Sequence, residues 1–202
     1  MSAITDYASL QTAVINWLHR SDLAAFVPDF IALAEGKMSS DIVARPMDVR
    51  TTLTTSTGNA YVTLPGDMLE MNRLILMTDP VYTLRYESPD QLSIDYPTAL
   101  TGKPSAFAVI GSQLQLAPIP DTAYTLELTY QQRIPALSST NTTNWLLTAF
   151  PNVYLYAALC AAQPFIMNDA RIPTFERLYM QGIEAINSID WYSGSTMRVR
   201  AR

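Results

Sequence analysis

The chain has 202 residues, of which 49% are hydrophobic and 15% are charged, and its formal net charge is −5. Soluble chains usually carry about 25% charged residues, so the sequence predicts a neutral and apolar surface that contacts other protein. The acidic balance argues against a protein that neutralises nucleic-acid phosphates. A single cysteine, Cys160, excludes an intramolecular disulfide, and a single histidine, His19, leaves too few soft ligands for a zinc site.

The first 46 residues show the apolar spacing of two helices. The first helix begins at Tyr7, with Thr5 or Asp6 as its cap, and breaks near residues 19–22. The second helix begins near Val27–Pro28 and stops at Pro46. Its acids Asp29, Glu35 and Asp41 are expected away from the buried stripe, which consists of Val27, Phe30, Ile31, Ala34, Met38 and Ile42.

From Met47 onward the apolar residues alternate with period two, which is typical of strands. The clearest strand is 124–130, where Tyr124, Leu126, Leu128 and Tyr130 are expected on one face, toward a core. A short helix is expected at 88–92. About seven short strands predict a small antiparallel sandwich or barrel-like sheet, with strands at 49–55, 61–64, 74–77, 81–86, 107–110, 113–117 and 124–130.

Helical spacing returns after a polar loop at 137–144. Asn144 is expected to cap a helix at Trp145, and Pro151 to open a helix that is apolar on nearly all sides and is therefore surrounded by protein. The final helix begins at Asp169 or Pro173 and ends at Ile189. Its expected stripe is Phe175, Leu178, Tyr179, Ile183 and Ile186.

This order of elements predicts an α+β fold: a helical bundle built from both chain ends, with a small antiparallel β module inserted. The expected parts are the N-terminal helices (1–46), the β module (47–136), the C-terminal helices (137–190) and an extended docking tail (191–202). The last eleven residues carry three arginines and no acid.

The sequence predicts no catalytic residues, no metal site and no cofactor. His19 with Asp22 or Cys160 is a possible functional pair, although a helix-end role explains His19 as well. Paired carboxylates remain formally open. No signal peptide is expected at the N-terminus, and prolines at 151 and 164 break the longest apolar stretch below the roughly 20 residues of a membrane span.

The C-terminal tail has three open interpretations. It is a solvated end, a nucleic-acid contact, or an extended segment that docks on a partner. The aromatic pair Trp191–Tyr192 would anchor such a segment, and the sequence from Met197 to Arg202 alternates apolar and basic residues.

Four stretches together resemble the head-to-tail adaptor (connector) proteins of tailed bacteriophages. They are YASLQTAVINWLHRSDLAAFVPDFIALAEGKM at 7–38, YVTLPGDMLEMNRL at 61–74, GSQLQLAPIPD at 111–121, and LELTYQQRIPALSSTNTTNWLLTAFPNVYLYAALCAAQPF at 126–165. They cover most of the chain. They are packing and turn patterns rather than catalytic signatures.

The resemblance implies a structural virion protein, made in the bacterial host cytoplasm, that forms a ring of twelve copies at the head–tail junction. Its implied partners are copies of itself, the portal protein and a downstream tail or nozzle protein. DNA would pass through the ring without specific binding, and no membrane is involved. The portal-docking role falls on Trp191, Tyr192, Met197, Arg198, Val199, Arg200 and Arg202.

Two other functions remain open on the residues. The β module could bind a receptor or carbohydrate through exposed Tyr82, Tyr86 or Tyr124. A hydrolase with scattered carboxylates is the weakest hypothesis. The β module is also less typical of all-helical adaptors, which leaves room for a related tail-completion role.

Overall fold

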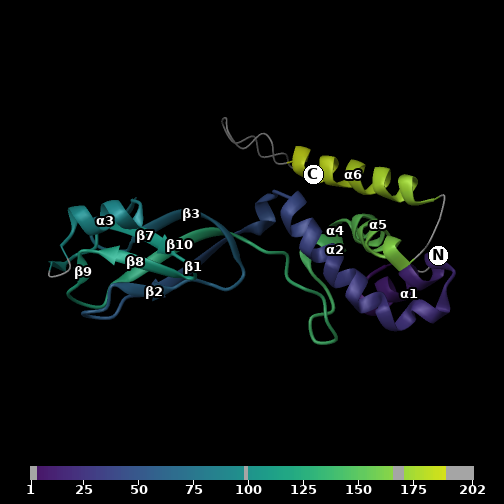
Figure 1. Ribbon diagram of the computed structural model, residues 1–202, viewed down its shortest axis with the longest axis horizontal. Coiled ribbons are helices and arrows are strands. Elements are labelled where there is room, and N and C mark those ends of the chain that lie inside the picture. Colours follow the sequence, from purple (N-terminus) through teal and green to yellow (C-terminus); the bar gives the residue numbers. More distant parts are fainter. Residues whose placement is uncertain (1–3, 98–99, 166–170, 190–202) are drawn as a thin grey trace. The chain divides into compact units, whose positions relative to one another are not determined.

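The computed structural model describes residues 4–97, 100–165 and 171–189 (Figure 1). In these residues the α-helices are α1 (Tyr7–Leu18), α2 (Val27–Asp41), α3 (Pro89–Asp95), α4 (Trp145–Ala149), α5 (Pro151–Ala161) and α6 (Ile172–Ile189). Short 3-10 helices are η1 (Ser21–Phe26), η2 (Arg45–Met47) and η3 (Gln163–Phe165). The strands are β1 (Asp48–Thr54), β2 (Tyr61–Thr63), β3 (Met68–Leu76), β4 (Tyr82–Thr83), β5 (Arg85–Tyr86), β6 (Thr101–Gly102), β7 (Ala106–Ile110), β8 (Gln113–Ala117), β9 (Ile119–Pro120) and β10 (Thr125–Gln132).

The chain divides into two compact units. Met1–Pro46 and Ile134–Arg202 form the helical unit, and Met47–Arg133 form the β unit. Each unit has its own buried apolar residues.

Side-chain caps begin two helices of the helical unit. Asp6 accepts a hydrogen bond from the backbone N–H of Ser9 at 2.8 Å and caps α1. Asn144 accepts one from the N–H of Leu147 at 2.8 Å and caps α4. The cap at Asn144 is confirmed, and of the two candidates Thr5 and Asp6 the structure selects Asp6. A short polar side chain at such a position satisfies N–H groups that have no partner inside the helix.

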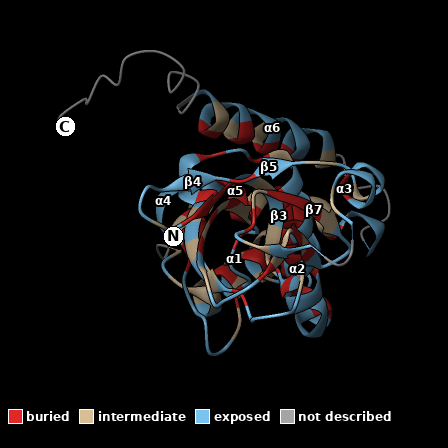
Figure 2. Cartoon of the chain, turned by 90° about the vertical axis from the view of Figure 1, so that its left-hand side faces the viewer, coloured by how far each residue is buried: buried red, intermediate tan, exposed pale blue. Residues whose placement is uncertain are grey.

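Helix α5 is the centre of the helical unit and contacts α1, α2, α4 and α6. Its residues are apolar on nearly all sides, as expected, and most are buried. Its neighbour α6 is amphipathic, with Phe175, Tyr179, Ile183 and Ile186 buried and the opposite face exposed (Figure 2).

Polar contacts fasten α6 to the end of α2. The hydroxyl of Tyr179 donates to Asp41 at 2.7 Å. Asn187 accepts from the N–H of Val43 and donates to the carbonyl of Asp41, both at 3.0 Å. The two ends of the chain are thereby joined in one unit by contacts between residues more than a hundred positions apart.

The β unit contains two four-stranded sheets. One has the order β1-β10-β3-β4 and the other β2-β8-β7-β5. The segment from Tyr82 to Tyr86 pairs first with β3 of one sheet and then with β7 of the other. The core between them includes Leu74, Leu84, Phe107, Leu114, Leu126, Leu128 and Tyr130, which confirms the predicted inward face of β10.

Helix α3 lies between β5 and β7 in the chain, and these two strands pair in parallel. A parallel pair needs a crossover connection, which is often a helix. Leu92 of α3 packs against Ala106, Ala108 and Ala117, whose small side chains leave room for it. A third, two-stranded parallel sheet joins β6 and β9.

The mixed α+β class is right, but the predicted architecture is wrong. The α-helices of the helical unit differ in length from 5 to 18 residues, and α1, α2, α4 and α6 pack against α5 rather than forming the expected bundle. The strands form three sheets with two parallel pairs instead of one small antiparallel module. Apolar spacing shows which face of an element is buried, but it does not show which element covers that face.

Candidate interaction surfaces

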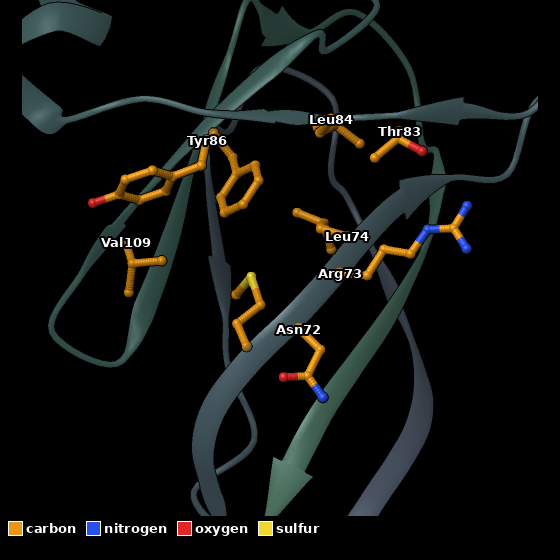
Figure 3. A pocket seen from close by; sticks show the side chains of 9 residues that line it. Asn72, Arg73, Leu74, Thr83, Leu84, Tyr86 and Val109 are labelled. Carbon is orange, nitrogen blue, oxygen red and sulfur yellow. The ribbon is translucent and has the colours of Figure 1, made fainter. Parts of the chain in front are cut away.

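An apolar groove opens between the two larger sheets of the β unit (Figure 3). In the close-up, Tyr86 and Val109 lie on one side, and Arg73 and Thr83 on the other. The groove has a volume of about 320 Å³. Its lining, hereafter the β3–β5 groove, comprises Met71, Asn72, Arg73, Leu74, Thr83, Leu84, Tyr86, Phe107 and Val109.

Local irregularities of the strands border the groove. The pairing of β10 with β3 shifts register beside Asn72, where Met71 and Arg73 pair with consecutive residues of β10. Strands β4 and β5 are two residues each, so they leave part of the core uncovered. Tyr86 is 62% exposed and its ring contacts that of Phe107 edge-on, with the ring centres 5.7 Å apart.

A second hollow, of about 280 Å³, lies beside α3 in the same unit. Tyr61 and Tyr96 contribute aromatic rings, and Asn59 and Gln115 contribute amides. No charged residue lines it among the described residues. Its surface is suited to neutral polar groups rather than to phosphates or carboxylates.

The helical unit exposes apolar side chains on α2 and beside it. Leu33 is 62% exposed, Phe26 43% and Phe165 47%. The rings of Phe26 and Phe165 lie 5.5 Å apart, and Phe165 also contacts the buried ring of Phe30 at 5.0 Å. Exposed aromatic rings of this kind are enriched where proteins contact one another.

A buried polar network lies behind α2. Glu35 is only 7% exposed and accepts hydrogen bonds from the N–H of Leu137 at 2.8 Å and from the hydroxyl of Tyr154 at 2.9 Å. That hydroxyl accepts one from Asn144 at 2.7 Å. Burial raises the pKa of Glu35, and the two hydrogen bonds oppose this shift in part. The expectation that Glu35 lies off the buried stripe is therefore wrong.

The position of Glu35 in the sequence contained a usable signal. Glu35 lies four residues after Ile31 and three before Met38, which places it on the buried stripe of α2. Its buried hydrogen-bond partners come from other elements, and the sequence could not identify them.

The residues predicted for portal docking lie outside the described part of the chain; they are Trp191, Tyr192, Met197, Arg198, Val199, Arg200 and Arg202. The three tyrosines considered for carbohydrate binding lie on different strands or loops. Tyr82 and Tyr86 are exposed, whereas Tyr124 is partly buried against the core and donates to Asp121 at 2.7 Å.

The structure does not bring the possible reactive groups together. His19 is the C-cap of α1 and its N–H donates to the carbonyl of Ile15. Asp22 forms an exposed ion pair with Arg20 at 2.7 Å. Cys160 is partly buried, and burial raises the pKa of its thiol, which disfavours the nucleophilic thiolate.

Asp67 has a role that turn chemistry alone did not predict. Its carboxylate accepts hydrogen bonds from Tyr130 at 3.2 Å and from Gln132 at 2.6 Å, and its carbonyl accepts from the N–H of Arg133 at 2.8 Å. It thus fastens the turn before β3 to the end of β10.

Within residues 4–97, 100–165 and 171–189, no cluster of acidic, histidine or cysteine side chains could hold a metal ion. No helix in the same residues combines the length and apolarity of a membrane span.

A family model described as "SU10 adaptor protein" matches residues 5–200, which includes nearly all of both units. No curated protein matches the chain.

Proposed function

Because the chain belongs to the SU10 adaptor family, we propose that it is a structural virion protein that joins the head of a tailed phage to its tail. The observation that carries this proposal is the family match over residues 5–200. The family is one of phage adaptors rather than a class of enzymes. The proposed protein forms a ring between portal and tail, with twelve copies, and lines the channel through which DNA leaves the head.

The composition and the surfaces support a role in assembly. Only 15% of residues are charged, and apolar side chains are exposed in both units. A ring requires two different surfaces on each copy, one for each neighbour. The net charge of −5 suits a channel wall, because an acidic surface repels DNA weakly instead of holding it.

The C-terminal tail is the proposed contact with the portal. Trp191 and Tyr192 would act as the anchor, and Arg198, Arg200 and Arg202 would pair with acidic grooves of the partner. The tail-side partner would contact another surface, for which the β unit is the candidate.

Electron microscopy of the purified chain mixed with portal tests this function. We expect rings with a central hole, bound to one end of the portal. A chain that stays single and leaves the portal bare would contradict the proposal.

Two tail variants test the docking segment. A chain ending at residue 190 should lose portal binding while its helical circular dichroism is unchanged. A full-length chain with Arg198, Arg200 and Arg202 replaced by alanine keeps the aromatic anchor and should bind more weakly, with less dependence on salt. Full binding by the truncated chain would remove the tail from the mechanism.

The alternative, a β unit that binds a receptor or carbohydrate, rests on the exposed rings of Tyr82 and Tyr86. Binding to a glycan array that is lost on Tyr82→Ala or Tyr86→Ala would support it. In that case Tyr124→Ala should bind glycans as well as the wild type does, because Tyr124 is partly buried and hydrogen-bonded to Asp121.

A further inference from the structure

The outer face of α2 has an unusual composition for a surface helix. Its exposed residues, hereafter the α2 outer face, are Pro28, Asp29, Ala32, Leu33, Gly36, Lys37 and Ser40. A solvent-facing helix surface is normally rich in charged side chains. Here Leu33 lies at the centre, flanked by Ala32 and Gly36, which allow close approach of another surface.

Two charged side chains lie on this face, Asp29 and Lys37. The ammonium of Lys37 lies over the ring of Tyr179, 5.0 Å from its centre. The other acids of α2 are engaged, Glu35 by Leu137 and Tyr154 and Asp41 by Tyr179. Asp29 remains, one helical turn before Leu33 and on the same side of the helix.

The β3–β5 groove has the complementary arrangement. Its floor is apolar, with Leu74, Leu84 and Phe107 at the base. Arg73 on its rim is exposed and forms no ion pair with any described residue. Asp29 on the α2 outer face and Arg73 on the rim of the groove therefore carry opposite charges, and each lies beside an apolar centre.

The size of the groove also restricts its occupant. A volume of about 320 Å³ is near the lower limit of the roughly 300–1,000 Å³ typical of small-molecule pockets. The groove is lined by side chains of strands β3, β4, β5 and β7 and of Leu84. It suits a few side chains of a helix better than an enclosed ligand.

We propose that the α2 outer face of one copy docks in the β3–β5 groove of a second copy, with Leu33 in the groove and Asp29 paired with Arg73. The contact joins two different surfaces, so each copy can bind one neighbour through α2 and another through the groove. This inference rests on the proposed function, for which it supplies the contact between copies.

Two variants each block one half of this contact. Leu33→Asp changes an exposed residue of α2, and Thr83→Arg places a long charged side chain in the groove. Asn16→Asp, which adds the same charge to the exposed side of α1, is the matched control. Sedimentation velocity over a concentration series measures self-association, and thermal unfolding checks that each variant is folded.

We expect the wild type and Asn16→Asp to associate, and each blocking variant to stay monomeric. Leu33→Asp should raise the dissociation constant by at least about a hundredfold, because it buries an unpaired charge. Mixed together, the two variants should form one-to-one complexes, since each retains the half that the other lacks. Asp29→Lys and Arg73→Glu should each weaken association by roughly fivefold, and together restore it.

Several results would overturn the inference. They are rings that persist in both blocking variants, a mixture of the two that stays monomeric, and a wild type that is monomeric at every concentration. The proposed function fails differently, because it is measured by binding to the portal. If the wild type binds the portal and the Leu33→Asp variant still self-associates, the proposed function stands and only the proposed contact between copies is refuted.

Discussion

Glu35 connects segments that are far apart in the sequence. Its carboxylate accepts from Leu137 and from Tyr154, whose hydroxyl in turn contacts Asn144. Asn144 also donates to the carbonyl of Pro135 at 2.8 Å. One buried carboxylate therefore fixes the segment that leads back from the β unit against α2, α4 and α5.

The Glu35→Gln variant should be more stable than the wild type at neutral pH. The folded state raises the pKa of Glu35 above its ordinary value of 4.5. Protonated Glu35 therefore stabilises the folded state fully below pH 4.5, and this stabilisation is lost as the pH rises through the pKa of Glu35 in the folded protein. Glutamine keeps an acceptor oxygen but never ionises, so the advantage of the variant should vanish at acidic pH.

Chemical denaturation of both chains across this pH range measures the effect. Glu35→Ala is the control, and it should cost about 1–3 kcal/mol at every pH because it leaves buried donors without an acceptor. If the difference in the free energy of unfolding between the wild type and Glu35→Gln does not change with pH, Glu35 does not titrate in this way.

The sequence predicted single residues where the cause is local. The caps of α1 and α4 depend on the backbone of the same few residues, so the sequence predicted Asn144 and narrowed the first cap to Thr5 or Asp6. The role of Glu35 depends on a partner 102 positions away, and that of Asp67 on a partner 65 positions away. Such contacts are fixed only by the tertiary fold.

At the scale of elements, α5 and α6 approach each other closely at Gly182. A Cβ atom at this position would lie 2.6 Å from Cγ2 of Val153, a fully buried side chain of α5. The absence of a side chain at Gly182 therefore permits the observed packing of the two helices.

Gly182→Ala should destabilise the chain by about 1–2 kcal/mol. Overpacking costs roughly 1–3 kcal/mol, which outweighs the helix propensity of alanine, about 1 kcal/mol. Gly36→Ala in α2 is the matched control, since its Cβ meets nothing within 4 Å, and it should stabilise the monomer by up to about 1 kcal/mol. Urea unfolding of dilute protein measures both.

A double variant separates the clash from other effects. In Gly182→Ala with Val153→Ala, the clashing methyl group is gone, so the combined loss of stability should be smaller than the sum of the two single losses. Strictly additive losses would show that Val153 is not the obstacle.

Elements were predictable where one period of apolar residues continued for long enough. Helix α2 and strand β10 follow their stripes closely. The expected strand 81–86 is instead divided between two sheets, with β4 and β5 pairing in opposite senses. A period of two describes both halves equally well, so only the pairing partners could reveal the division.

At the scale of the whole molecule, the candidate groove depends on that same division. Its lining comes from three separate segments, around residues 71–74, 83–86 and 107–109. Each segment was expected to contain strand residues, but their meeting point was not predictable. The low charge of the sequence indicated that some surface contacts other protein, without locating it.

The chain enters and leaves the β unit at neighbouring points. Asp48 at the start of β1 pairs with Gln131 near the end of β10, and paired Cα atoms of antiparallel strands lie about 4.5–5.5 Å apart. Residues 47–133 can thus be removed as one piece. The remaining ends, Pro46 and Ile134, can be joined by a short glycine–serine linker.

We predict that both pieces fold separately. Isolated residues 47–133 should unfold cooperatively, with a stability of about 0.05–0.15 kcal/mol per residue, since the core between the two larger sheets lies wholly within them. The linked helical piece should keep its helical circular dichroism, because α5 packs against α1, α2, α4 and α6 and the hydrogen-bond partners of Glu35 lie in the same unit. Thermal unfolding of each piece, compared with the full chain, measures this. A β piece without a cooperative transition would show that the two units depend on each other for folding.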